Sequence, residues 1–292
     1  MTTNQAQEIA EGFYVDSQGV RIYCTDSGGD GIPLVLMHGL TANLHSFDGY
    51  MNAGLGDHFR VIRMDLRGRG LSDSPDEYSM ESHMNDLLAI LAFFNLKKAM
   101  IGGHSFGALL SIYSSYFNPE VFEAMIIIDA AARLHPDARN MLIPTLSRID
   151  KIWNSMEEYL AEMKSAEYLS GMWNTSLESY FKADVRYFEN GSVTTCSRND
   201  NIQKATESVF SIGLQWLNFI GGIQCPVLLI NAPGPYQGGE ALLPENFARE
   251  TVDLIKNCEY LKVPGNHMTM MFELGAILSV DAIIHFIEKL SQ

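Results

Sequence analysis

Short runs of apolar residues recur along the chain, and each run is bounded by turn-forming or polar residues. Runs of this length, rich in β-branched side chains, are typical of strands that are buried on both faces. The pattern therefore predicts seven strands, at residues 21–24, 33–37, 60–64, 99–101, 124–128, 226–230 and 260–263.

Stretches with helical spacing separate several of these strands. In residues 82–94, apolar side chains return at steps of three and four positions, which is the period of one helix face. The same spacing runs through residues 274–290, where the predicted stripe consists of Ile277, Val280, Ile284 and Ile287. Strands that alternate with helices predict an α/β fold, in which a mostly parallel sheet is covered on both faces.

This alternation is interrupted once, between residue 130 and the strand at 226–230. The intervening stretch shows no convincing strand, but it has helical runs rich in aromatic residues and methionine. It also contains all three tryptophans, Trp153, Trp173 and Trp216. We expect a helical insertion that leaves the sheet at a strand end, with most of these side chains in its own core and a few facing a pocket.

The composition excludes two classes of protein. The chain has 292 residues, 47% of them hydrophobic, so it is neither disordered nor dependent on disulfides for a core. It carries 20 Lys and Arg against 35 Asp and Glu, a formal net charge of −15. A field of this sign repels phosphate backbones, so nucleic acid is not an expected partner.

Cysteine spacing and the N-terminal sequence bear on location. The N-terminal residues show no basic segment followed by an apolar one, so a signal peptide is not expected. No apolar run approaches the roughly 20 residues that cross a bilayer, so no membrane association is expected. A reducing cytoplasm is the predicted location, because the cysteines lie far apart without paired spacing, at Cys24, Cys196, Cys225 and Cys258.

The sequence GHSFG at residues 103–107 lies between the strand at 99–101 and a helical run. Ligands of open parallel sheets bind outside the carboxyl ends of the strands, so this position is informative. A G-x-S-x-G motif between strand and helix is typical of a nucleophile elbow, a tight turn that strains the serine and exposes it. Ser105 is therefore the candidate nucleophile. The alternative is a glycine-rich turn that only begins a helix.

Two further strand ends carry groups that suit the same chemistry. After the strand at 33–37 comes HGLT, where the backbone N–H of Leu40, together with that of Phe106, is expected to form an oxyanion hole. His38 is expected to be a hydrogen-bonded strut rather than a catalyst. After the last strand comes His267, the candidate general base.

Other polar residues receive structural interpretations. The loop DLRGRGLS at residues 65–72 is expected to brace neighbouring turns through Asp65 and Arg67 rather than to take part in catalysis. No histidines have the spacing of metal ligands, so neither a metal nor another cofactor is predicted.

These motifs, in this order and at these strand ends, resemble the α/β-hydrolase fold family. The resemblance implies a mostly parallel, eight-stranded sheet with a helical cap inserted after the sixth strand. It divides the chain into a first core segment at 1–132, a cap at 133–222 and a second core segment at 223–292.

The acid of the implied catalytic triad is ambiguous. Most family members place it just after the strand that matches 226–230, but residues 231–237 contain neither Asp nor Glu. Some haloalkane dehalogenases place it after the preceding strand, and Asp129 fits that position. Asp129 is the preferred assignment, although an Asp there also caps its strand in relatives with the usual acid. Glu240 is the alternative acid, and either another acidic residue or a serine–histidine dyad remains open.

A serine nucleophile predicts acyl transfer without a cofactor. Hydrolysis of an ester or lactone is the first hypothesis, and cleavage of an amide or of a carbon–carbon bond beside a carbonyl is the second. A protein that binds a small molecule, with a vestigial triad, is a hypothesis from another class. The segment 133–222 holds nine basic and eleven acidic residues, so we expect a small, largely apolar substrate with little or no charge. The sequence does not indicate an oligomeric state.

Overall fold

The computed structural model of the chain describes residues 12–133 and 135–290. The N-terminal residues 1–11, on which the signal-peptide prediction rests, lie outside this part. Within it, eight strands form one sheet in the order β1-β2-β4-β3-β5-β6-β10-β11. The pairs β1–β2 and β2–β4 are antiparallel, and the other neighbours are parallel. The strands are β1 (Phe13–Ser17), β2 (Val20–Asp26), β3 (Ile32–Met37), β4 (Phe59–Met64), β5 (Ala99–His104), β6 (Phe122–Ile128), β10 (Val227–Asn231) and β11 (Cys258–Lys262).

The predicted α/β architecture is confirmed, and all seven predicted strands are present. The sequence pattern missed β1, because only Val15 and Ser17 of this edge strand are buried and its other residues are partly or fully exposed. It therefore lacks the continuous apolar run that marks the central strands.

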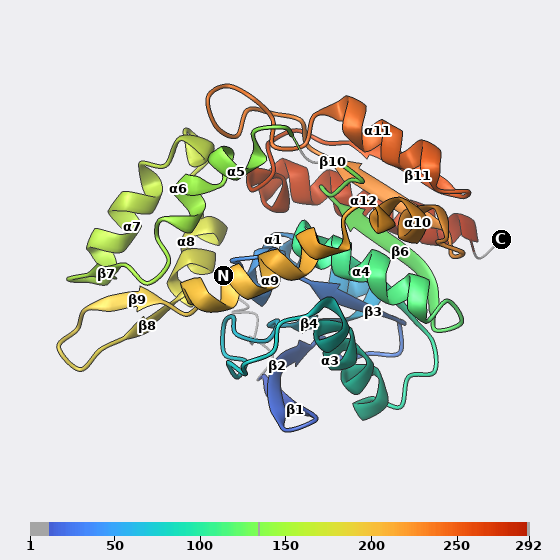
Figure 1. Ribbon diagram of the computed structural model, residues 1–292, viewed down its shortest axis with the longest axis horizontal. Coiled ribbons are helices and arrows are strands. Elements are labelled where there is room, and N and C mark those ends of the chain that lie inside the picture. Colours follow the sequence, from blue (N-terminus) through green and yellow to red (C-terminus); the bar gives the residue numbers. More distant parts are fainter. Residues whose placement is uncertain (1–11, 134, 291–292) are drawn as a thin grey trace, which may run out of the picture.

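Helices cover both faces of the sheet (Figure 1). Side chains alternate between the two faces of a strand, so in β3 Leu34 and Leu36 belong to one core and Val35 and Met37 to the other. The first core includes side chains of α1, α2 and α12, and the second includes side chains of α3, α4, α10 and α11. These helices are α1 (Asp48–Asn52), α2 (Leu55–His58), α3 (Met80–Phe93), α4 (Phe106–Phe117), α10 (Gln215–Gly221), α11 (Glu245–Leu254) and α12 (Glu273–Leu290).

The predicted stripe of the last helix is partly wrong. Val280 and Ile287 are buried as expected, but Ile277 is 47% exposed. Ile283 and Phe286 contribute to the buried face instead. Both sides of α12 are rich in apolar residues, so spacing alone did not identify the face that packs on the sheet. No helix in the described ranges is long and apolar enough to cross a membrane.

The insertion between β6 and β10 is not purely helical, which corrects the sequence prediction. Its short strands form a three-stranded antiparallel sheet in the order β7-β9-β8. At two or three residues each, they were too short to give an apolar pattern. Its elements are α5 (Ala138–Met141), α6 (Ile143–Leu146), β7 (Ile152–Trp153), α7 (Met156–Lys164), α8 (Thr175–Ala183), β8 (Val185–Tyr187), β9 (Val193–Thr195), α9 (Asn199–Ile212) and α10.

The turn between β5 and α4 is crowded on both sides. A Cβ atom at Gly103 would lie 2.2 Å from the carbonyl carbon of Gly107. A Cβ atom at Gly107 would lie 2.0 Å from the carbonyl oxygen of Met37, at the end of β3. Only glycine permits this approach of three backbone segments, so the two glycines of the GHSFG motif fix the position of Ser105, midway between them.

We predict that Gly107→Ala lowers the free energy of unfolding by about 3 kcal/mol or more, because the new methyl group overlaps backbone that cannot move away. Chemical denaturation followed by circular dichroism measures this change. The control is Gly221→Ala in α10, where the nearest atom to the added Cβ is 3.8 Å away. The free energy of unfolding of that variant is expected to equal the wild-type value or to exceed it by up to about 1 kcal/mol. Equal stabilities of the two variants would contradict the packing argument.

Candidate active site

Ser105 occupies the turn between β5 and α4 in a strained conformation. Its backbone angles are φ 53° and ψ −112°, and its N–H donates to the carbonyl oxygen of Ile128 over 2.9 Å. A non-glycine residue in this region costs of order 1–3 kcal/mol and needs surrounding structure to hold it there. The hydroxyl stands at the N-terminal end of α4, where the helix dipole favours negative charge.

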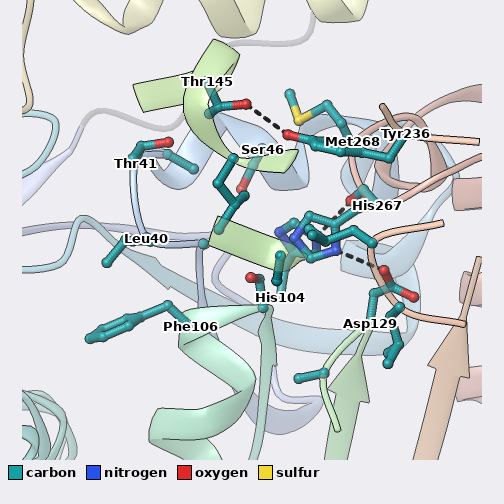
Figure 2. Close-up of a pocket in the computed structure, with 18 of the residues that line it drawn as sticks. Leu40, Thr41, Ser46, His104, Phe106, Asp129, Thr145, Tyr236, His267 and Met268 are labelled. Carbon is teal, nitrogen blue, oxygen red and sulfur yellow. Dashed lines mark hydrogen bonds and ion pairs between the residues drawn. The ribbon is translucent and has the colours of Figure 1, made fainter. Parts of the chain in front are cut away.

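Five residues singled out from the sequence line one cavity of about 160 Å³ (Figure 2). The core supplies part of its wall and the insertion supplies the rest, mostly with apolar side chains. None of the three tryptophans is among the residues that line it. The five residues are Leu40, Ser105, Phe106, Asp129 and His267.

His267 and Asp129 form a buried pair. The Nδ1 atom of His267 lies 2.7 Å from Oδ2 of Asp129, and an ionised carboxylate can only accept a hydrogen bond. Nδ1 therefore carries the proton, and Nε2 is left as the acceptor. The second carboxylate oxygen, Oδ1, accepts from Nδ2 of Asn231 over 2.8 Å and from the N–H of Ala232 over 2.9 Å. The imidazole is thus held in one tautomer by a carboxylate that is itself fixed.

Asn231 is a site residue that the sequence reasoning missed. It ends β10, at the start of the segment searched for an acid, and its Oδ1 accepts from the hydroxyl of Tyr260 over 3.0 Å. β6 and β10 are parallel neighbours, so their carboxyl ends place Asp129 and Asn231 side by side. The sequence signal that could have identified Asn231 is its polar side-chain amide at the end of β10, the strand beside the one that precedes Asp129.

Glu240, the alternative acid, is not brought to the histidine. Its carboxylate pairs with Nε2 of His135 over 3.0 Å, and its side chain is 65% exposed. It is not among the residues that line the cavity. The geometry therefore favours Asp129 over Glu240 as the partner of His267.

Two backbone N–H groups at the cavity have no acceptor among the described residues. Phe106 is the first residue of α4, and Leu40 lies in the loop after β3. The peptide that carries the Leu40 N–H is fixed by His38, whose Nδ1 donates to the Gly39 oxygen over 2.7 Å and whose Nε2 accepts from Leu66 over 3.0 Å. Burial lowers the pKa of His38 to about 3, so it stays neutral. Its predicted role as a strut agrees with these contacts.

His104 and Arg69 bond carbonyl oxygens in the loops around the cavity. Nε2 of His104 donates to the carbonyl oxygen of His267 over 2.8 Å, and burial holds the pKa of His104 well below its ordinary value. Nε of Arg69 donates to the carbonyl oxygen of Leu40 over 3.0 Å, and its guanidinium carbon lies 5.4 Å from the ring centre of Phe106. Neither contact could be predicted from the sequence.

The loop after β4 has the bracing role that was predicted for it. Asp65 accepts from the N–H groups of Leu44 and Leu71, each over 2.8 Å. Arg67 forms a two-pronged pair with Asp86, with both contacts at 2.7 Å. These bonds remain within the scaffold, and neither Asp65 nor Arg67 lines the cavity. Among the residues that the structure describes, no cluster of His, Cys, Asp or Glu is placed to hold a metal ion.

A model of the alpha/beta hydrolase fold matches residues 32–274, which is most of the chain. The chain belongs to the α/β-hydrolase fold family. The sheet order, the serine turn and the His267–Asp129 pair described above are therefore features of a member of this family.

Relatives of this α/β-hydrolase fold protein differ in their named substrates. The 2-(acetamidomethylene)succinate hydrolase of Mesorhizobium japonicum is 27% identical over 147 residues, half of either chain. A crystal structure of E-2-(acetamidomethylene)succinate hydrolase has a TM-score of 0.81 at 20% identity, covering 95% of this chain and 99% of that one. The enol-lactonase of Burkholderia xenovorans LB400 has a TM-score of 0.71 at 19% identity, covering 94% and 100%. The matches span about half the length of the curated relatives, or less.

We predict that acid destabilises this α/β-hydrolase fold protein partly through His38. Its pKa is about 3 when folded against 6.5 unfolded, so its contribution to stability is complete above pH 6.5 and is lost as the pH falls toward 3. Between pH 7 and pH 5 this loss is about 2 kcal/mol. The free energy of unfolding, measured by denaturant titration, should therefore fall about 2 kcal/mol less in His38→Asn than in the wild type.

The matched control for this pH experiment is His285→Asn. His285 is exposed on α12, and we expect its variant to follow the wild-type pH dependence. If His38→Asn follows the wild-type curve as well, His38 is protonated in the folded chain and the argument fails.

Proposed function

We propose that the chain is a cofactor-independent serine hydrolase that cleaves a carboxylic ester or lactone through an acyl-enzyme. One observation carries the proposal: the strained Ser105, the His267–Asp129 pair and two unpaired backbone N–H groups share one cavity. A nucleophile, a base with a fixed tautomer and a pair of oxyanion donors are the parts that acyl transfer requires.

The proposed reaction proceeds in two halves. Ser105 Oγ attacks the carbonyl carbon of the substrate while Nε2 of His267 takes the hydroxyl proton. Asp129 stabilises the imidazolium that forms, and the N–H groups of Leu40 and Phe106 donate to the oxyanion. The intermediate collapses, and His267 returns the proton to the departing alkoxide. Water then attacks the acyl-enzyme in the same way, which releases the acid and restores Ser105.

Features of the cavity limit the substrate of this proposed reaction. A volume of about 160 Å³ suits a small molecule, since a cavity of roughly 150 Å³ holds benzene. The insertion, which the family resemblance interprets as a cap, contributes Leu142, Leu146, Val209 and Phe210 to the wall. Such a wall supports a substrate with an apolar portion near the scissile bond.

Amide cleavage is the second candidate, because one relative reported above is named for a substrate with an acetamido group. The same catalytic groups serve amides and carbon–carbon bonds beside a carbonyl. Rates on matched esters, lactones, amides and β-diketones rank these bond types for the purified chain.

We predict that a fluorophosphonate probe labels the wild-type chain and that Ser105→Ala abolishes the labelling. The probe reacts only with an activated serine, so it reports the complete catalytic arrangement. Ser46, another serine on the cavity wall, provides the control, and Ser46→Ala is expected to keep the label. An unlabelled wild-type chain would favour a protein that only binds its small molecule.

We predict that Asp129→Asn lowers kcat on 4-nitrophenyl acetate by up to about 10⁴-fold, because the imidazole loses both its fixed tautomer and its counter-charge. Glu240→Gln, which alters an exposed carboxylate, is expected to stay near the wild-type rate. Steady-state kinetics on the two variants measure the difference. A near-wild-type Asp129→Asn would show that another group acts as the triad acid.

A further inference from the structure

Arg148 is a buried cation on the wall of the cavity. Its side chain comes from the insertion and is 2% exposed. Nη1 donates to Oδ2 of Asp184 over 2.6 Å, and Nη2 donates to the carbonyl oxygen of Thr41 over 3.0 Å. Its Nε–H is buried and has no acceptor among the residues that the structure describes. The Nε–H donor of the guanidinium is therefore unused.

An unused donor on a buried arginine needs an explanation. Buried polar groups are nearly always paired, and leaving a charged donor without an acceptor is unfavourable. Burial, the largest single influence, lowers the pKa of Arg148, but the charge of Asp184 and the influence of the neighbouring tyrosines together outweigh burial. The pKa of Arg148 is therefore raised, and the side chain remains cationic. The missing partner is therefore expected to be an acceptor that enters the cavity.

The hydroxyl of Tyr180 provides a second unused donor on the same wall. Tyr180 is buried, it lines the cavity, and its hydroxyl has no hydrogen bond to any described residue. Burial, the largest influence, raises the pKa of Tyr180, so this hydroxyl keeps its proton. The neighbouring hydroxyl of Tyr236, by contrast, is paired with Oγ1 of Thr145 over 2.7 Å. Two unused donors from one insertion thus share the cavity.

The distribution of charge favours an anionic acceptor. Asp184, the partner of Arg148, is not among the cavity-lining residues, whereas Arg148 is. The other charged side chain on the wall, Asp129, has both oxygens occupied by His267, Asn231 and Ala232. On the part of the wall that the insertion supplies, the unused hydrogen-bonding groups therefore include a cation and a hydroxyl.

We propose that Arg148 and Tyr180 form a subsite for a carboxylate of the substrate, so that the substrate is a small ester, lactone or amide that also carries a carboxylate. This inference rests on the proposed hydrolase function. Composition led us to expect a substrate with little or no charge. This proposal replaces that expectation with an anionic substrate, because the near-neutral insertion places Arg148 at the cavity. A carboxylate suits this site because charge-assisted hydrogen bonds to guanidinium are among the strongest in proteins.

The chain also limits the length of this substrate. Thr41, which accepts from Arg148, follows Leu40, whose N–H is the proposed oxyanion donor. Two residues span at most about 7 Å, so the guanidinium lies within about 10 Å of that donor. A four- or five-carbon diacid derivative spans this distance.

The competing account is that Arg148 only ties the insertion to the Thr41 loop. A tie affects every substrate alike, whereas a carboxylate subsite discriminates by charge. The test therefore compares monomethyl glutarate with methyl 4-carbamoylbutanoate, which has the same shape and a neutral amide in place of the carboxylate. The ratio of the two kcat/KM values, with glutarate or glutaramate release measured by chromatography, is the readout.

We expect the wild type to prefer the carboxylate by at least about tenfold, chiefly through KM. Tyr180→Phe is expected to lower that ratio severalfold. The double variant Arg148→Met/Asp184→Asn is expected to remove the preference. The double variant avoids the buried, unpaired Asp184 that Arg148→Met alone would leave. The matched control is Arg186→Met, which removes an exposed arginine of the same insertion and is expected to keep the wild-type ratio.

A binding measurement separates this inference from the proposed function. Calorimetric titration of Ser105→Ala with glutarate and with glutaramide requires no catalysis. Tighter binding of glutarate that is lost with Arg148 supports the subsite, even if no ester is hydrolysed. Equal binding of the two ligands together with equal kcat/KM values would overturn it. A carboxylate preference that survives the double variant would overturn it as well.

Discussion

The carboxylate of Asp129 connects the parts of the site that come from distant segments of the chain. One oxygen binds His267, after β11, and the other binds Asn231 and Ala232 at the end of β10. β6, β10 and β11 are adjacent parallel strands, so their carboxyl ends meet at one edge of the sheet. A carboxylate with partners on both oxygens cannot rotate without breaking bonds that are shielded from water, and its orientation fixes that of the imidazole.

A second group of buried polar residues holds the backbone around the cavity. His38, His104 and Arg69 each bond a carbonyl oxygen in the loops after β3 and β11. The two histidines remain neutral because burial disfavours their charged form. Burial also lowers the pKa of Arg69, to about 10, which still leaves this side chain protonated at neutral pH. Leu40 and Phe106, whose N–H groups are the proposed oxyanion donors, therefore belong to backbone that is already in place, and electrostatic stabilisation requires such preorganised donors.

Sequence reasoning succeeded where a local pattern determines the structure. Central strands appear as apolar runs because both of their faces are buried. The GHSFG motif could be recognised because the tight turn requires its glycines. It failed for β1 and for the insertion sheet, whose short or half-exposed strands leave no such run. It preferred Asp129 to Glu240 but left Glu240 open, because that choice depends on which strand ends are neighbours. Arg148 carried no signal, since the burial of one arginine is decided by tertiary packing.

The proposed catalytic groups and the proposed carboxylate subsite come from different parts of the chain, which matters for evolution and engineering. Every group assigned to bond breaking belongs to core elements or their loops, whereas Arg148 and Tyr180 belong to the insertion. Mutations in the insertion can thus alter which molecules are accepted while the core retains its chemistry. Transplanting an insertion between members of this fold is accordingly a route to new selectivity. The transplant must preserve the hydrogen bond from Arg148 to the carbonyl oxygen of Thr41, because Thr41 follows Leu40, whose N–H is a proposed oxyanion donor.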